Sequence, residues 1–390
     1  MATLQDIVSL AKRRGFIYPG SEIYGGMAGF YDYGPLGNEL KFNIKQSWWR
    51  NMVQMRDDVV GISAAIIMNP KAWEASGHVG TFSDEMFKTS VGRTENDSSV
   101  AYLRPETAGG IFVNFKNVLD SMHLKLPFGI AQIGKAFRNE INPRDFIFRT
   151  REFEQMELEY FVRPGDDEKA FDKWVKERVA WYKSIGLKNI REHEQPPEER
   201  AHYSKATIDI EYEFPFGWQE IEGIANRGNF DLTAHQKASV KDLAYFDEET
   251  KEKYLPYVIE PSAGVERIML AVLCDAYTEE DDRVVLKLHP TLAPYKVAVF
   301  PLLANKEKLI AKAESIRDAL KKRWMTAWDD RGNIGKRYRS QDEVGTPFCV
   351  TIDFDSLEQN DVTVRDRDTM EQKRVAASDL EAYLAERLTS

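Results

Sequence analysis

The chain of 390 residues is long enough for two or three domains, each with its own hydrophobic core. Apolar residues make up 43% of the sequence and charged residues 30%, and the aromatic share of 12% argues against a disordered chain. The formal net charge of -10 excludes a uniformly basic nucleic-acid coat, but not a protein that binds RNA through a local patch or by shape.

The sequence also argues against a membrane protein, a secreted protein and a cysteine-rich framework. The longest uncharged apolar run, Ile268–Cys274, is far shorter than the ~20 residues of a membrane-spanning helix, so we expect no membrane partner. No apolar segment follows the basic residues 12–14, and we expect no signal peptide. Two cysteines, Cys274 and Cys349, and six histidines without metal-ligand spacing predict no disulfide framework, no zinc and a reducing, cytoplasmic location.

Residues 1–293 have the pattern of an antiparallel sheet with helices. Runs of aromatic and β-branched residues predict strands at Phe128–Phe137, Phe146–Val162, Thr207–Phe214, Gly217–Ile224 and Tyr257–Pro261. Apolar residues at helical spacing predict helices at Leu40–Val53, with its start at Asn38, and at Asp167–Ile185.

A domain boundary is predicted between residues 293 and 294, because Pro290 and Pro294 cannot lie inside a helix or a central strand. Beyond it, strand and helix patterns alternate and predict a small α/β domain over residues 294–390. This domain carries equal numbers of acidic and basic residues, so the excess of acid lies in residues 1–293. Its basic cluster, Lys336, Arg337 and Arg339, fits either an RNA contact or a solvated helix.

The predicted strand at residues 146–162 carries two very different faces. A period of two places Arg149, Arg151, Phe153, Gln155, Glu157 and Glu159 on one face, and Phe148, Met156, Leu158 and Tyr160 on a core-like face. Along the first face, two cations are followed by one aromatic ring and then by acids. This order favours a surface on which a flat, charged ligand binds. Guanidinium groups fork onto phosphate oxygens, an aromatic ring can stack on a purine, and carboxylates can hold an ammonium group.

Three nearby patterns each have an ordinary explanation as well. Arg138 and Glu140 share a strand face and, taken alone, would be a surface ion pair. Glu220 and Glu222 are also predicted on one strand face, where they would bind Mg²⁺ or simply form an acidic edge. Arg267 near a helix start works against the helix dipole unless an anion lies close by, which would be a bound ligand or simply Glu260 or Glu266 in a capped core helix.

No glycine-rich phosphate loop of the P-loop or Rossmann type is present, so any nucleotide would lie on the antiparallel floor.

Two of these stretches resemble signature motifs of class II aminoacyl-tRNA synthetases, and in detail those of the dimeric glycyl-tRNA synthetases. FRNEINPRDFIFRTREFEQMELEYF (Phe137–Phe161) resembles motif 2, and IEPSAGVER (Ile259–Arg267) resembles motif 3. Residues 23–49, 69–84 and 201–232 also resemble this family, and the tail resembles the anticodon-binding domain shared with the histidyl, prolyl and threonyl enzymes.

The resemblance covers nearly the whole chain and implies an α+β fold. A class II antiparallel sheet flanked by helices would form the catalytic domain, residues 1–293. A C-terminal α/β anticodon-binding domain, residues 294–390, would follow it.

The reaction implied is the activation of glycine by ATP to glycyl-adenylate and its transfer to the 3′ end of tRNA(Gly). The catalytic residues would be Arg138, at the α-phosphate and the glycine carboxylate, and Arg267, which would hold the adenine against Phe153. The ATP-binding residues implied are Arg138, Asn139, Glu140, Phe148, Arg149, Thr150, Arg151, Glu152, Phe153, Glu220, Ile221, Gly264, Val265, Glu266 and Arg267. The glycine-binding residues implied are Arg93, Glu106, Phe153, Gln155, Glu157, Glu260, Ser262 and Gly264. Glu220 and Glu260 would bind the Mg²⁺ that accompanies ATP.

Glycine offers no side chain to bind, so alanine has to be excluded by lack of room. We expect Glu106 and Glu157 to form the wall that excludes it. One departure from the family is the segment between Phe87 and Tyr102, which is shorter than in many relatives and has no cysteine. The role of Arg93 and the grip on the tRNA acceptor end depend on this segment.

Two alternatives remain beside this interpretation. A non-catalytic paralogue that binds nucleic acid should have lost some of Arg138, Glu140, Phe153 and Arg267, but all four are present. A synthetase for another amino acid would need a larger pocket, and the threonyl enzyme a Cys/His metal set that the sequence lacks. Class II folds usually pair through motif 1, so a homodimer is expected, with Tyr31, Tyr33, Trp48 and Trp49 as candidate interface or core residues.

Overall fold

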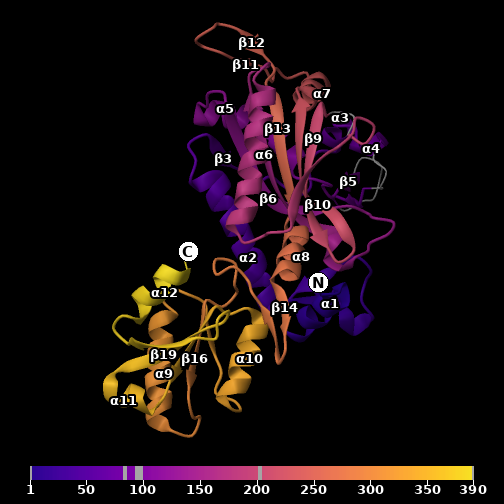
Figure 1. Cartoon of the computed structure of the whole chain (residues 1–390). Coiled ribbons are helices and arrows are strands. Elements are labelled where there is room, and N and C mark those ends of the chain that lie inside the picture. Colours follow the sequence, from indigo (N-terminus) through magenta and orange to yellow (C-terminus); the bar gives the residue numbers. More distant parts are fainter. Residues whose placement is uncertain (1, 82–85, 93–99, 201–203, 389–390) are drawn as a thin grey trace.

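The computed structural model describes residues 2–81, 86–92, 100–200 and 204–388. It is 37% helical and 30% strand, which confirms the predicted α+β class. Figure 1 shows a larger unit built on a seven-stranded sheet and, below it, a smaller unit, coloured orange to yellow, built on a five-stranded sheet.

The larger sheet is antiparallel except at one edge. Its strand order is β3 (Val59–Gly61), β6 (Phe128–Phe137), β7 (Glu152–Val162), β13 (Tyr257–Gly264), β10 (Gly217–Gly228), β9 (Ala206–Phe214) and β8 (Ile190–Glu194). Only β3 and β6 run parallel. Four two-stranded ribbons accompany it: β1 (Ile17–Pro19) with β2 (Tyr31–Tyr33), β4 (Lys88–Ser90) with β5 (Val100–Tyr102), β11 (Tyr245–Phe246) with β12 (Lys253–Tyr254), and β14 (Tyr277–Glu280) with β15 (Arg283–Leu286).

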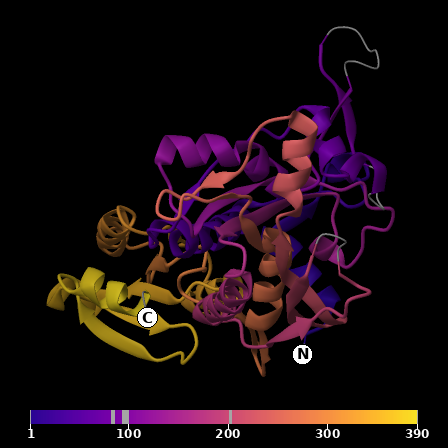
Figure 2. The same ribbon diagram turned by 90° about the horizontal axis from the view of Figure 1, so that it is seen from above.

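Helices cover both faces of this sheet. They are α1 (Leu4–Arg13), α2 (Pro35–Trp49), α3 (Pro70–Ala75), α4 (His78–Thr81), α5 (Ala108–Met122), α6 (Asp167–Ser184), α7 (Phe230–Ser239) and α8 (Val265–Ala276). Seen from above in Figure 2, α5 and α7 lie on one side of the sheet, and α6 and α8 lie on the other. No helix among the described residues is both long and apolar enough to cross a bilayer.

Successive side chains along β7 point to opposite faces of the large sheet, so the strand shows which face is core and which carries the cavity. Leu158 and Tyr160 pack into the core under α6 and α8, whereas Phe161 packs into a second core under α5. Phe153, Gln155 and Glu157 also point to the α5 side, but they lie at the other end of the strand, where no helix covers them and a cavity opens.

Two predicted elements begin at other residues than expected. The strand predicted from Phe146 begins at Glu152, because Asp145 and Phe146 have φ angles of 58° and the chain makes a short 3₁₀ turn at Phe146–Phe148. The helix predicted from Leu40 begins at Pro35, directly after the N-cap Gly34, and it ends in a π turn at Arg50–Gln54.

The smaller unit is a mixed sheet between helices. Its strand order is β17 (Thr326–Trp328), β16 (Val297–Pro301), β18 (Phe348–Ile352), β19 (Asp361–Asp366) and β20 (Gln372–Ala376), and its helices are α9 (Glu307–Leu320), α10 (Ile334–Val344), α11 (Phe354–Gln359) and α12 (Leu380–Leu388). The first three strands of this order are parallel and the last two antiparallel. Asp342 of α10 joins this sheet to the larger unit, since it accepts hydrogen bonds from Arg283 of β15 at 2.8 Å and from Arg365 of β19 at 2.8 and 3.0 Å.

The basic cluster on α10 is not one surface. Arg337 is 2% exposed, and its guanidinium donates to the backbone carbonyls of Pro301 at 2.6 Å, Asp330 at 2.8 Å and Gly332 at 2.9 Å. The cluster interpretation was therefore wrong for Arg337, which holds the loop before α10 and is not available to RNA. Arg339 is exposed but pairs with Asp282 of the larger unit, and Lys336 points to solvent.

This burial predicts a difference between two neighbouring residues. Arg337→Met leaves the buried carbonyl of Pro301 and the partly buried carbonyls of Asp330 and Gly332 without this donor, and it is expected to lower the free energy of unfolding by about 2–4 kcal/mol. Lys336→Met, one residue earlier but exposed, is expected to change it by less than about 0.5 kcal/mol. Urea unfolding of both variants checks this, and equal effects would contradict the structural role of Arg337.

Candidate active site

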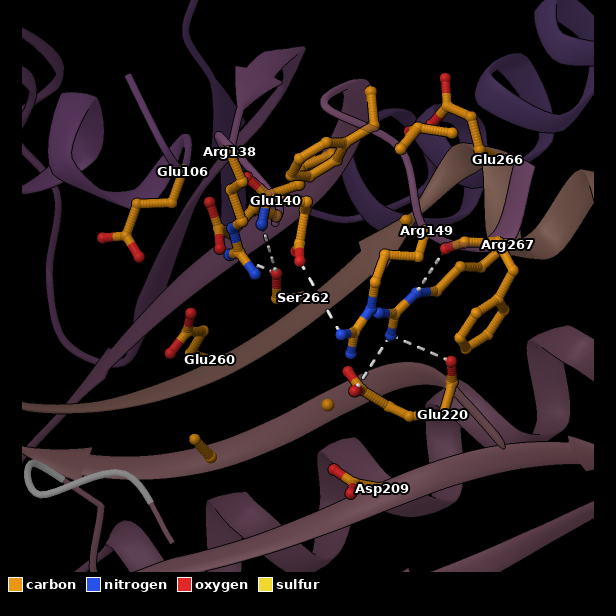
Figure 3. A pocket seen from close by; sticks show the side chains of 18 of the residues that line it. Glu106, Arg138, Glu140, Arg149, Asp209, Glu220, Glu260, Ser262, Glu266 and Arg267 are labelled. Carbon is orange, nitrogen blue, oxygen red and sulfur yellow. Dashed lines mark hydrogen bonds and ion pairs between the residues drawn. The ribbon is translucent and has the colours of Figure 1, made fainter. Parts of the chain in front are cut away.

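A polar cavity of about 250 Å³ opens on the α5 side of the large sheet, at the end that no helix covers. Side chains from β7, β9, β10, β13 and α8 point into it, as Figure 3 shows for the labelled residues. The predicted site residues that line it are Glu106, Arg138, Glu140, Phe148, Arg149, Thr150, Phe153, Gln155, Glu157, Glu220, Glu260, Ser262, Gly264, Glu266 and Arg267. Residues up to 161 positions apart in sequence are thus brought to one place by the sheet.

Five predicted residues do not line the cavity, and each has another place. Arg151 donates to the backbone carbonyls of Glu140 at 3.0 Å and Ala28 at 2.9 Å, so it shapes the neighbouring loops. Ile221 and Val265 are buried in the core behind the cavity.

Glu152 pairs with Lys135 at the start of β7, beside the cavity. Asn139 is half-buried in the segment after β6. Arg93 lies outside the described residues, so its predicted contact with glycine stays a prediction.

Arg267 at one end of the cavity and Arg138 nearer to Glu106 each lie against an aromatic ring. The Arg267 guanidinium carbon is 4.6 Å from the centre of the Phe148 ring, and that of Arg138 is 5.5 Å from the centre of the Phe153 ring. Arg267 also donates to Glu220 Oε2 at 3.0 Å (Figure 3). Phe153 and Arg267 therefore share the cavity, but the ring that Arg267 contacts is Phe148.

The other end of the cavity is held by a small hydrogen-bond network. Glu157 accepts from the hydroxyl of Thr107 at 2.5 Å and from that of Ser262 at 2.8 Å. Gln155 accepts from the backbone N–H of Thr107 at 3.2 Å and donates to Ser262 Oγ at 3.4 Å. The carboxylate of Glu157 is thereby fixed in orientation. The sequence analysis did not select Thr107, although it directly follows Glu106.

Glu106 lies at the same end and is kept charged. Its Oε2 is 3.3 Å from Nε2 of His78. Burial alone would raise the pKa of Glu106, but the positive charges of His78, Arg227 and Arg138 outweigh it and lower the pKa to about 2. Glu106 is therefore expected to be ionised and paired with His78.

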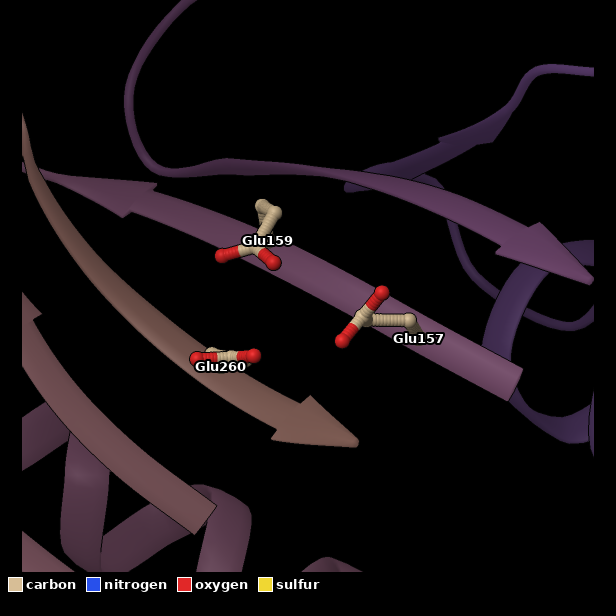
Figure 4. A group of neighbouring side chains, drawn as sticks. All are labelled: Glu157, Glu159 and Glu260. Atoms are coloured by element: carbon tan, nitrogen blue, oxygen red, sulfur yellow. The ribbon is translucent and has the colours of Figure 1, made fainter. Parts of the chain in front are cut away.

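Three further carboxyl groups meet beside it. Glu157, Glu159 and Glu260 are all buried, and their oxygens lie within 4.8 Å of one another (Figure 4). Glu260 accepts from Arg227 at 2.5 Å, whereas neither oxygen of Glu159 has a hydrogen-bond partner among the described residues. Burial, together with Glu157 and Glu106, raises the pKa of Glu260 to about 8 in spite of Arg227, and burial with Glu260 raises that of Glu159 well above its usual value. Such a group can share protons or receive a cation such as an ammonium.

The predicted acidic face of β10 was wrong, because a β-bulge lies between Glu220 and Glu222. Glu222 is buried on the far side and pairs with Arg178 of α6 at 2.7 Å, while Glu220 faces the cavity. A Cβ atom at Gly223 would lie 3.5 Å from Glu220 Oε1 and 3.6 Å from Asp209 Oδ1, so these two acids sit together. Burial and the neighbouring Glu220 raise the pKa of Asp209 to about 6.

The predicted magnesium pair, Glu220 with Glu260, does not form a single site. Glu260 lies across from Ala225, five residues along β10 from Glu220, which is roughly 15 Å in an extended strand. Magnesium requires ligands at about 2.1 Å, so one ion cannot bind both carboxylates. Asp209, which the sequence analysis missed, is the partner that lies close to Glu220. The alternation of polar Thr207, Asp209 and Glu211 with apolar residues along β9 is the signal that could have found it.

Comparison with known proteins agrees with this architecture. Residues 87–276 match the tRNA synthetase class II core domain (G, H, P, S and T), and residues 296–387 match an anticodon binding domain. Fold and site thus define a class II tRNA synthetase, a class that uses ATP and a divalent metal. Glycine–tRNA ligases of Thermobifida fusca and Streptomyces coelicolor are each 49% identical over an alignment of 453 positions, covering 99% of this chain and 98% of theirs. That of Treponema denticola is 49% identical, covering 97% and 95%.

The chain belongs to the glycine–tRNA ligase family. The alignments of 453 positions are longer than this chain of 390 residues, so the relatives contain segments that it lacks. This agrees with the expectation of a shortened segment, whose place near residues 87–102 stays a prediction.

The buried acids predict a pH-dependent stability. The folded state keeps a proton on Glu159 that the unfolded chain releases above pH ~4.3, so this residue lowers the free energy of unfolding as pH rises, by at most about 1.4 kcal/mol per pH unit. Glu159→Gln removes this loss, and the variant is expected to gain stability over the unmodified chain between pH 5 and pH 8. Urea unfolding at both pH values measures it, with the exposed Glu248→Gln as control. If the difference in the free energy of unfolding between Glu159→Gln and the unmodified chain were the same at both pH values, a protonated Glu159 in the folded state would be contradicted.

Proposed function

We propose that this chain is a glycine–tRNA ligase, which activates glycine with ATP and transfers it to the 3′ end of tRNA(Gly). The observation that carries the proposal is the cavity, in which Arg149 and Arg267 lie at one end, the fixed carboxylates of Glu106 and Glu157 lie at the other, and Arg138 lies beside Glu106. The first end suits a triphosphate and the second an ammonium group. Membership of the glycine–tRNA ligase family supports the choice of amino acid.

Two displacements make up the reaction. An oxygen of the glycine carboxylate attacks the α-phosphorus of ATP, and the bond to the pyrophosphate oxygen breaks. A ribose hydroxyl of the tRNA then attacks the carbonyl carbon, and AMP leaves. Arg138 would stabilise the negative charge of the carboxylate and the α-phosphate as they approach, and Arg267 that of the departing phosphates. No protein nucleophile is needed, because positioning and electrostatics supply the catalysis.

Magnesium, and not zinc, is the metal we propose. Asp209 and Glu220 offer carboxylate oxygens beside Arg267, which are the ligands that Mg²⁺ prefers. The ion would reduce the repulsion between these two acids and spread the charge of the leaving pyrophosphate.

Selection of glycine would depend on the rigidity of the acidic end. Glu157 is held by two hydroxyl donors and Glu106 by His78, so neither carboxylate can move aside freely. A methyl group on the α-carbon would meet these fixed groups, and a clash discriminates better than a missing contact.

We further propose a catalytic domain of residues 1–293, an anticodon-binding domain of residues 294–390 and a homodimer in the cytoplasm. The edge strand β3 and the exposed side chains of Met55, Ile66 and Ile67 near it support a pairing surface. Trp48 was expected either at the interface or in the core. It is fully buried in the core of its own chain, so it does not contribute to the pairing surface.

Glycine-dependent exchange between ATP and pyrophosphate tests the proposed function. We expect exchange with glycine and none above background with alanine, serine or proline. Arg138→Ala is expected to lower kcat/KM at least about 100-fold, because it removes charge stabilisation in the transition state. Arg144→Ala, an exposed arginine of the same loop, serves as control and should have little effect. Exchange with another amino acid, or none at all, would refute the assignment.

The dimer has a separate test. Static light scattering at micromolar concentration is expected to give twice the mass of one chain, and Ile67→Asp is expected to shift the population toward the monomer. A monomer for the unmodified chain would refute this part of the proposal and leave the assigned reaction in place.

A further inference from the structure

A buried lysine lies directly behind the cavity. Lys41 of α2 is 7% exposed, and its Nζ is 2.6 Å from Glu266 Oε1 and 2.7 Å from Glu154 Oε2. The same ammonium lies 3.8 Å from the centre of the Tyr33 ring. Lys41 itself does not line the cavity, yet it contacts two elements that do.

The two acids that Lys41 binds are sequence neighbours of the residues expected to hold the adenine. Glu154 follows Phe153 on β7, and Glu266 precedes Arg267 in the first turn of α8 (Figure 3). The second oxygen of Glu266 accepts from the backbone N–H of Glu154 at 2.9 Å. One lysine therefore joins α2 to β7 and α8 at the point where the nucleotide would lie.

The charges of this cluster depend on one another. Burial alone would lower the pKa of Lys41, but Glu266 and Glu154 raise it above its usual value, so the side chain stays cationic. Burial opposes the ionisation of Glu154, and Lys41 and Lys45 still lower its pKa. Removal of Lys41 would leave the buried carboxylate of Glu266 without this cation and Glu154 with Lys45 alone, and proteins relieve an unpaired buried charge by moving the side chain toward water.

We propose that Lys41 is a positioning residue for the nucleotide, which fixes the backbone at Phe153 and Arg267 through Glu154 and Glu266. This inference rests on the proposed function, since it assumes that ATP binds between these residues. The acidic end of the cavity is held by Thr107, Ser262 and Glu157, a network that contains no contact to Lys41. Lys41 should therefore affect ATP much more than glycine, which a general role in folding would not do.

Lys41→Met is the direct test, with Lys45→Met as its matched control. Lys45 lies one turn further along α2, is more exposed and contacts Glu154 at 2.8 Å without reaching Glu266. In the exchange reaction Lys41→Met is expected to raise KM for ATP at least about tenfold and KM for glycine less than about twofold, whereas Lys45→Met should raise KM for ATP less than about threefold. Lys41→Arg keeps the charge and should restore part of the ATP affinity.

Calorimetric titration of ATP into the same variants separates this inference from the proposed function. If the unmodified chain binds ATP but does not exchange with glycine, the function is refuted, and the ratio of ATP dissociation constants still tests Lys41. Should Lys41→Met fail to fold, Glu154→Gln, which leaves Lys41 paired with Glu266, is expected to weaken ATP binding about threefold without changing glycine binding. Equal changes for both substrates, or unchanged ATP binding, would overturn the role of Lys41.

Discussion

This site depends on one constraint, which is that cations or protons must balance the charge of its buried carboxylates. Glu106, Glu157, Glu159 and Glu260 are all buried around one small cavity, and such a concentration of negative charge is stable only if cations or protons balance it. His78 balances Glu106 and Arg227 balances Glu260. The negative charge that these two cations leave unbalanced is offset by a proton shared among Glu157, Glu159 and Glu260. In the proposed reaction, the ammonium group of the amino acid offsets it further.

The antiparallel sheet makes this arrangement possible. Alternation along β7 sends Leu158 and Tyr160 into the core and Gln155 and Glu157 toward the cavity, so one strand supplies both stability and the floor of the site. The bulge in β10 separates Glu220 from Glu222 and gives each acid its own arginine, Arg267 in the cavity and Arg178 in the core. The two ends of the cavity are thereby held by different hydrogen-bond networks, one around Glu220 and Arg267 and the other around Glu157, Thr107 and Ser262.

Much of this could be predicted from the sequence, and the failures have physical causes. The period of two was correct within β7, because one face of the strand packs against helices and the other does not. It failed before residue 152, where the 3₁₀ turn brings Phe148, expected on the core-like face, to the cavity beside Arg267. The bulge at Glu220 has no sequence signature, so the face of Glu222 was wrong. Arg337 looked like a surface cation because its partners are backbone carbonyls, which any residue supplies. Lys41 was not selected because Glu154 and Glu266 are distant in sequence, and only the fold brings them to it.

A crystal structure with a non-hydrolysable glycyl-adenylate analogue shows directly where the nucleotide and the amino acid bind. We expect the adenine between Phe153 and Arg267, the phosphate mimic at Arg138, and the ammonium within hydrogen-bond distance of Glu157. An adenine bound elsewhere, or an ammonium directed away from the buried carboxylates, would contradict this arrangement.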